Sequence, residues 1–427
     1  MSADQLTQGL SLVNSMSMTF DPYPLILQAI FDQQKKLIHP DLPRFAIILG
    51  VVHIILLVVA AVTLILKVFR RQNGERQKIW LWRKHYLADQ TIPYLVPNGN
   101  FVIEPLQICG CVFYLLFVFG VYWTVKYPQS TPDVVHAGVV FWHAVALVPG
   151  STAFWLSGWG AFYVVYLAPG QANSGRSPHK KNIIQHPLVM NTICISIPVL
   201  IAGYFLFVGI AMFIEIKQVI NTYELVTLRL NQLSVGWKPN DPTSLENNRI
   251  LFDIFITLSE KTNRLISMAQ AEALGWATVS ITMIAFYIST TIATVKLLKN
   301  SLLMAGRSQS VYQKPDPQEK SKESLNSSTA SKTRDCESKS NLSGYIFKNY
   351  LSLTRLQRSY YFIYISCGIM AIVLGLNFTT SVLFAIKMKT LIQETQWQAK
   401  LIDLITCTTV MLSFSLFLQS LMLSIWG

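Results

Sequence analysis

Seven polar side chains stand out because they lie inside, or at the ends of, long apolar stretches of the sequence. They are His53, His136, His143, Glu215, Glu272, Asn377 and Asp403. Ionisable groups are costly inside a bilayer, so such residues are candidate functional sites. Imidazoles and carboxylates can exchange protons and can hydrogen-bond a ligand. The set predicts a ligand-binding site or a path for protons or ions, although each residue near a span end is, taken alone, also explained as an interfacial group that reaches headgroup water.

Depth divides these residues into two groups when the apolar stretches are taken as membrane spans. His53, His143 and Asn377 lie well inside their spans. The other four lie near span ends predicted to face outward, where they would ring an outward-opening cavity: His136, Glu215, Glu272 and Asp403. His136 and His143 are two helical turns apart and share a helix face. We expect these residues to bind a ligand, and the alternative for the histidines is a purely structural hydrogen bond.

Catalytic and metal-binding signatures are missing from the sequence. It contains no H-E-x-x-H motif and no C-x-x-C pair. Of its six cysteines, only Cys336 lies in a polar segment, and the others are within apolar stretches. A zinc site needs several His, Cys or carboxylate ligands at defined spacing. We therefore expect no enzymatic activity, no metal and no cofactor.

The composition is that of a membrane protein. The 427 residues are 52% hydrophobic and only 13% charged, whereas soluble proteins average about 25% charged. A net charge of +13 is compatible with nucleic-acid binding, but the 35 Lys and Arg are scattered between apolar stretches and form no single basic stripe. We therefore expect contact with membrane lipid and no contact with nucleic acid.

The apolar stretches have the length of membrane-spanning helices, which need about 20 residues. Seven are present: Phe45–Leu66, Ile103–Val125, Val135–Tyr166, Leu188–Ile214, Ala271–Val295, Tyr360–Ile386 and Leu401–Trp426. The third is long for one crossing and short for two, and we interpret it as one tilted helix kinked near Pro149-Gly150. The predicted fold class is all-α, a polytopic bundle of seven transmembrane helices.

Basic residues set the predicted orientation. They concentrate in the connections at 67–84, 176–181 and 296–358, whereas the short connection Lys126–Asp133 is almost uncharged. By the positive-inside rule the first set is cytoplasmic, so the N-terminus is outside and the C-terminus inside. The predicted organisation is an extracellular segment 1–44, spans one to five in 45–298, a cytoplasmic loop 299–358 that is disordered at about 307–344, and spans six and seven in 359–427.

The long connection at about 217–270 is predicted to be an outer helical hairpin between spans four and five. Apolar residues recur at helical spacing on both sides of the turn signal Gly236–Pro242. Thr243 and Glu246 form a plausible capping box for the second arm.

This layout resembles the seven-span G-protein-coupled receptors in architecture, with an outer N-terminus and a long basic loop between spans five and six. No motif accompanies the resemblance: span three ends in Tyr163-Val-Val-Tyr, and span seven ends in Ser424-Ile-Trp-Gly427 without an Asn-Pro-x-x-Tyr sequence. The resemblance implies a receptor that senses a ligand from the outer side.

Receptor-like sensing is therefore the predicted function, and two alternatives remain open. One is a non-catalytic scaffold that binds a partner protein through the outer hairpin, and the other is a transporter of a small solute or ion. The expected partners are an extracellular ligand or protein and a cytoplasmic partner at loop 296–358. The generous span lengths favour the plasma membrane over endomembranes.

Overall fold

The computed structural model describes residues 20–69, 71–72, 75–76, 81–86, 91–128, 130–166, 186–239, 241, 243–312, 361, 364–365, 367–391, 394, 396–408 and 410–411. It is mostly helical (88%), in agreement with the all-α class. Residues 1–19 of the predicted N-terminal segment and residues 313–358 of the predicted loop 299–358 lie outside the described residues.

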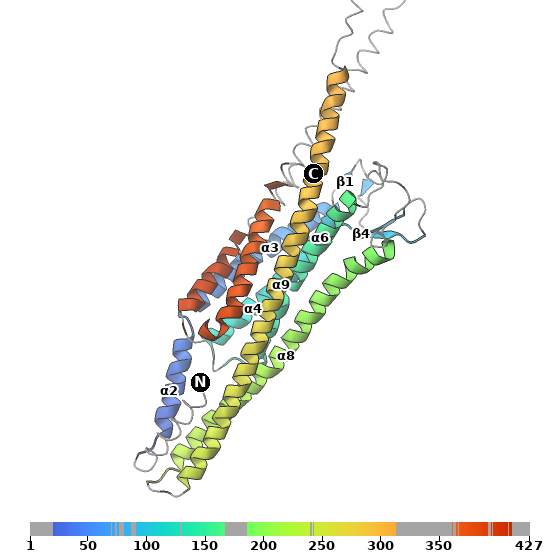
Figure 1. Ribbon diagram of the computed structural model, residues 1–427. Helices are drawn as coiled ribbons and strands as arrows, with labels where there is room; N and C mark the ends of the chain where they lie inside the picture. Colours follow the sequence, from blue (N-terminus) through green and yellow to red (C-terminus); the bar gives the residue numbers. More distant parts are fainter. Residues whose placement is uncertain are drawn as a thin grey trace, which may run out of the picture.

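Seven helices carry the described fold, with two further helical stretches at 367–391 and 396–408. The seven are α2 (Tyr23–Leu37), α3 (Leu42–Phe69), α4 (Gly99–Lys126), α5 (Asp133–Ala146), α6 (Val148–Tyr166), α8 (Pro187–Val235) and α9 (Ser244–Tyr312). Figure 1 shows them as an elongated bundle in which α8 and α9 run along most of its length.

Six helical segments of the described chain are long and apolar enough to cross a membrane: Leu42–Phe69, Phe101–Lys126, Asp133–Gly160, Pro187–Val235, Ser244–Asn300 and Cys367–Leu391. They indicate a multi-pass membrane protein. The predicted seventh span at 401–426 is described only at 401–408 and 410–411, where it is helical.

Helix α3 shows why these segments suit a bilayer. One face, which includes Ala46, Leu49 and Leu56, is buried against the bundle. The opposite face leaves Ile47, Val51 and other large apolar side chains about half exposed (53% and 51%). An apolar face of this extent is stable in contact with lipid and unfavourable in water.

The third apolar stretch forms helices α5 and α6 with a break between them. The break is at Leu147, two residues before the predicted kink, because Pro149 has no N–H to donate to the preceding turn. Both helices pack along α4: Gly120 lies against Val139 of α5, and Gly110 lies against Pro149 of α6. The two helices thus follow the same partner helix in succession.

Two small antiparallel sheets join α3 to α4, and the sequence analysis did not predict them. The first pairs β1 (Arg71–Gln72) with β2 (Glu75–Arg76), and the second pairs β3 (Trp82–His85) with β4 (Tyr94–Pro97). Asn191 of α8 holds β4 in place: its Oδ1 accepts from the Leu95 amide at 2.8 Å and its Nδ2 donates to the Pro93 carbonyl at 2.8 Å.

Helices α8 and α9 run together to the turn that joins them, and we call residues 217–270 of this pair the arm. Val226 and Leu230 of α8 pack against Leu251 of α9 in the arm's core. The arm ends at the turn between α8 and α9, at the opposite end of the molecule from β1 and β4 (Figure 1).

Helix α2 packs against the tip of this arm, a contact that the sequence analysis missed. The Tyr23 hydroxyl donates to Oδ1 of Asn248 at 2.7 Å, and the Ser234 hydroxyl donates to Oδ2 of Asp21 at 2.8 Å. Burial raises the pKa of the Tyr23 phenol, so it remains a proton donor at neutral pH.

Candidate functional site

A cavity lies inside the bundle between α3, α4, α5, α6, α9 and the helix at 367–391, and we call it the central cavity. The volume that the centre of a water-sized molecule can occupy in this cavity is about 220 Å³. On the same measure, one water needs roughly 10–15 Å³. The cavity is therefore large enough for a small organic molecule. Four of the seven predicted site residues line it: His53, His143, Glu272 and Asn377.

His143 and Glu272 form the most polar contact in this cavity. Nδ1 of His143, on α5, lies 2.9 Å from Oε1 of Glu272, on α9. The Glu272 side chain is only 1% exposed, whereas the imidazole is 36% exposed and faces the cavity. The second carboxylate oxygen, Oε2, is buried and has no hydrogen-bond partner among the described residues.

Glu272 is enclosed by neighbouring helices of the bundle. The apolar stretch that starts at Ala271 suggested a position near an outer span end. In the structure α9 is already packed in the bundle before that point, because Ala269 belongs to a buried cluster with Met212 of α8, and Leu265 packs against this cluster. Glu272 consequently lies level with His143, inside the bundle.

Aromatic rings surround this acid–histidine pair. The ring centroid of the His143 imidazole lies 5.2 Å from that of Phe117 and 5.8 Å from that of Phe384. Trp276, one turn after Glu272 on α9, stacks on Phe205 at 3.7 Å. Its indole Nε1 is buried and lacks a hydrogen-bond partner in the described part of the chain.

His53 and Asn377 supply further polar groups to the cavity wall. Nδ1 of His53 donates to the Leu49 carbonyl at 2.8 Å, and its ring stacks on Tyr114 at 3.7 Å. A neutral imidazole that donates through Nδ1 keeps Nε2 as an acceptor. Nδ2 of Asn377 donates to the Ser280 hydroxyl at 2.8 Å.

The other three predicted site residues do not line the central cavity. His136, at the start of α5, donates from Nε2 to the Pro128 carbonyl at 3.3 Å. Glu215 is half-buried on α8. Asp403 is exposed, whereas Ile405 and Thr408 of the same helix face the cavity.

Sequence reasoning missed the aromatic and hydroxyl residues of the site, since such side chains are common in membrane helices. One signal was available on α9. Glu272, Trp276 and Ser280 recur at a spacing of four residues, which places all three on one helix face. All three line the cavity.

A second cavity adjoins the first and shares wall residues with it, including His53, Tyr114 and Phe154. It offers about 140 Å³ on the same measure and extends towards Ile103 and Gln107 of α4. The two cavities together follow α4 over much of its length.

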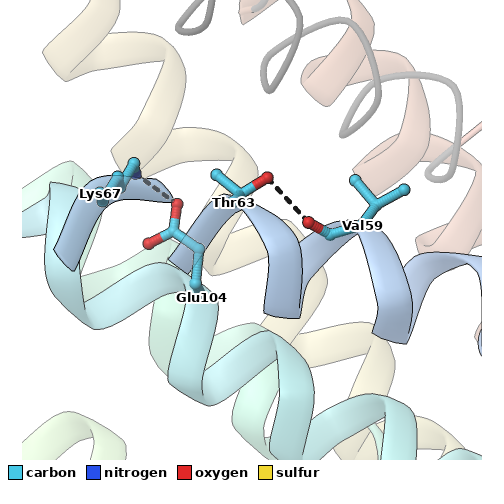
Figure 2. Close-up of polar contacts among 4 residues, drawn as sticks. All are labelled: Val59, Thr63, Lys67 and Glu104. Carbon is cyan, nitrogen blue, oxygen red and sulfur yellow. Dashed lines mark hydrogen bonds and ion pairs between the residues drawn. The ribbon is translucent and has the colours of Figure 1, made fainter. Parts of the chain in front are cut away.

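A buried ion pair joins α3 and α4 near the end of α4 that the second cavity approaches. Figure 2 shows Lys67 pointing at Glu104, with Thr63 one turn earlier on α3 donating to the Val59 carbonyl at 2.8 Å. The two charged side chains are 17% and 8% exposed. Such a pair holds two helices in register, because either charge alone is costly to bury.

Within the described ranges, no group of three or more His, Cys, Asp or Glu residues could hold a metal ion. Comparison of the chain with protein-family models, with curated proteins and with solved structures finds no match.

Proposed function

We propose that this multi-pass membrane protein is a receptor-like, non-catalytic sensor that binds a small ligand in the central cavity. The observation that carries the proposal is the His143–Glu272 pair, because it places a buried carboxylate and an imidazole in the wall of a cavity inside the bundle. Pockets with a mostly apolar wall and a few converging polar groups are typical ligand sites.

The proposed topology has seven spans, with the seventh helix at 401–426, the N-terminus and the arm outside, and the C-terminus in the cytoplasm of a plasma-membrane protein. The basic connection that contains β1 to β4 supports this orientation, since it lies at the opposite end from the arm (Figure 1).

Helix α9 supports a signalling role. This one helix of 69 residues begins at the arm tip, carries Glu272 in the cavity wall and continues to Tyr312. At about 1.5 Å per residue it is roughly 100 Å long. A ligand that shifts α9 at Glu272 would move its far end, where loop 296–358 is the proposed contact for a cytoplasmic partner.

Transport of a small solute is the second candidate. The specific observation in its favour is the second cavity. It continues from the central cavity towards the N-terminal half of α4, at Ile103 and Gln107. A transported solute needs sites in succession across the bilayer.

Two neighbouring threonines test whether a ligand occupies the central cavity. Thr380 lines it, whereas Thr379 on the same helix is exposed. A small-molecule library is screened for compounds that raise the melting temperature of the purified full chain. For a ligand found in this way, we expect Thr380→Trp to abolish the stabilisation and Thr379→Trp to preserve it.

Equal stabilisation of both threonine variants would place the ligand elsewhere and contradict the proposal. Uptake of the same ligand into liposomes that contain the protein separates the two functions. A receptor binds the ligand without accumulating it, and a transporter accumulates it.

A further inference from the structure

The carboxylate of Glu272 is only half satisfied. Oε1 is bound to Nδ1 of His143 at 2.9 Å, whereas Oε2 is buried without a hydrogen-bond partner among the described residues. A buried acceptor that lacks a donor is unfavourable, and an ionised one is more so. A group that donates a hydrogen bond to Oε2 would therefore be bound strongly.

The charges of the cavity wall favour a positively charged donor. Glu272 is the only carboxylate among the described residues that line the central cavity, and none of those residues is a lysine or an arginine. Nδ1 of His143 contacts Oε1 alone, so the second carboxylate oxygen, Oε2, stays without a hydrogen-bond partner among the described residues. A single carboxylate is a poor site for a divalent metal ion, which takes several oxygen ligands. A monovalent cation suits this wall better.

The aromatic rings favour an organic cation over an inorganic one. Phe117 and Phe384 line the cavity, with ring centroids 5.2 and 5.8 Å from that of the His143 imidazole. Trp276 follows Glu272 by one helical turn and also lines the cavity. Aromatic faces attract cations and bury apolar groups at the same time, so they suit an ammonium ion that carries a hydrocarbon body.

We propose that the ligand of the central cavity is a small organic ammonium ion with an apolar or aromatic body, whose N–H donates to Oε2 of Glu272. This inference rests on the proposed function, because it names the class of ligand for the same site. The amide of Asn377 and the hydroxyl of Ser280, 2.8 Å apart in the wall, provide polar contacts for a second group on the ligand.

Three probes of nearly equal shape test the charge preference: 2-phenylethylammonium, 2-phenylethanol and phenylacetate. Their binding to the full-length protein in lipid nanodiscs is measured at neutral pH by thermal stabilisation and by titration of tryptophan fluorescence. We expect saturable binding of the ammonium ion and weaker binding of the alcohol and the acid. Loss of one charge-assisted hydrogen bond corresponds to about a 10- to 100-fold weaker affinity.

Two variants test whether the Glu272 carboxylate causes the preference for the ammonium ion. Glu272→Gln should weaken the binding of the ammonium ion by about 10- to 100-fold and leave the affinity for the alcohol unchanged. Glu260→Gln is the matched control, since Glu260 is an exposed glutamate of the same helix, and it should bind all three probes as the wild type does. If Glu272→Gln does not fold, the comparison of ammonium and alcohol on the wild type still decides the charge preference.

Three outcomes would overturn the inference, and they separate it from the proposed function. Equal or tighter binding of the alcohol or the acid, abolished by Thr380→Trp, would leave a ligand cavity that is not selective for cations. Absence of binding by all three probes would overturn the ammonium class and leave the library screen as the test of the cavity. Binding of the ammonium ion that survives Thr380→Trp would overturn both proposals, because the ion would then bind elsewhere.

Discussion

Nδ1 of His143 lies 2.9 Å from Oε1 of Glu272, although the two residues are 129 positions apart in the sequence. The contact joins α5 to α9 inside the bundle. The side chains of both residues also line the central cavity. The pair is thus both a structural link between two helices and the most polar part of the candidate site.

Substitutions measure how much this contact contributes to the free energy of unfolding. His143→Leu removes the donor and leaves the buried carboxylate with neither oxygen paired, so we expect a loss of about 2 kcal/mol or more in the free energy of unfolding. The double variant His143→Leu/Glu272→Leu should recover much of this loss, since no charge remains buried. Unfolding of the purified protein in denaturing detergent measures both. A double variant no more stable than the single one would contradict the assignment.

The Lys67–Glu104 pair should stabilise the α3–α4 contact in the same way. Glu104→Gln removes the negative charge beside a lysine that is only 17% exposed, and we expect a loss of about 1–3 kcal/mol. A double-mutant cycle with Lys67→Met isolates the interaction between the two side chains. Additive effects of the two substitutions would show that the pair contributes nothing to stability.

Close packing between α6 and α9 depends on Gly158. A Cβ at this position would lie 2.8 Å from the ring of Phe286, which is itself stacked on Trp155 at 4.5 Å and has little room to move. Gly158→Ala should therefore cost about 1–3 kcal/mol. Gly203→Ala is the control, because no atom lies within 4 Å of a Cβ there. Equal melting temperatures of the two variants would contradict the predicted steric clash.

The hydrogen bond from Tyr23 to Asn248 should hold α2 on the arm. Tyr23→Phe removes the hydroxyl, and we expect a local loss of about 1 kcal/mol that speeds hydrogen exchange in α2. Tyr86→Phe, at a tyrosine that is 58% exposed, should leave the exchange of α2 unchanged. If exchange in α2 is the same in both variants, the hydroxyl does not hold the helix.

Labelling on intact cells tests the proposed orientation. A cysteine that replaces Lys238, in the turn between α8 and α9, should react with a membrane-impermeant maleimide. A cysteine that replaces Arg83, in β3, should react only after permeabilisation. The reverse pattern would invert the topology and move the arm to the cytoplasm.

The spans were predictable because length and hydropathy are local properties of the chain. The predicted stretches Phe45–Leu66 and Ile103–Val125 fall within α3 and α4, and the long third stretch is helical with a break beside Pro149. Proline removes a backbone donor from its own helix, so a break at Pro149 could be predicted locally, although Pro198 lies inside α8 without ending it. The strands β1 to β4 were missed, since pairing across so few residues leaves no clear pattern in the sequence.

For the candidate site, some of the residues were predictable, but their arrangement was not. The sequence by itself determined that His53, His143, Glu272 and Asn377 are polar residues among apolar ones, because their side-chain chemistry is unfavourable in lipid wherever they lie. Only the tertiary structure decided that they share a cavity, that Glu272 lies level with His143, and that His136, Glu215 and Asp403 lie elsewhere. The physical reason is that a helix sequence defines its own polar and apolar faces, whereas partners, depth and enclosure depend on how separate helices pack against one another.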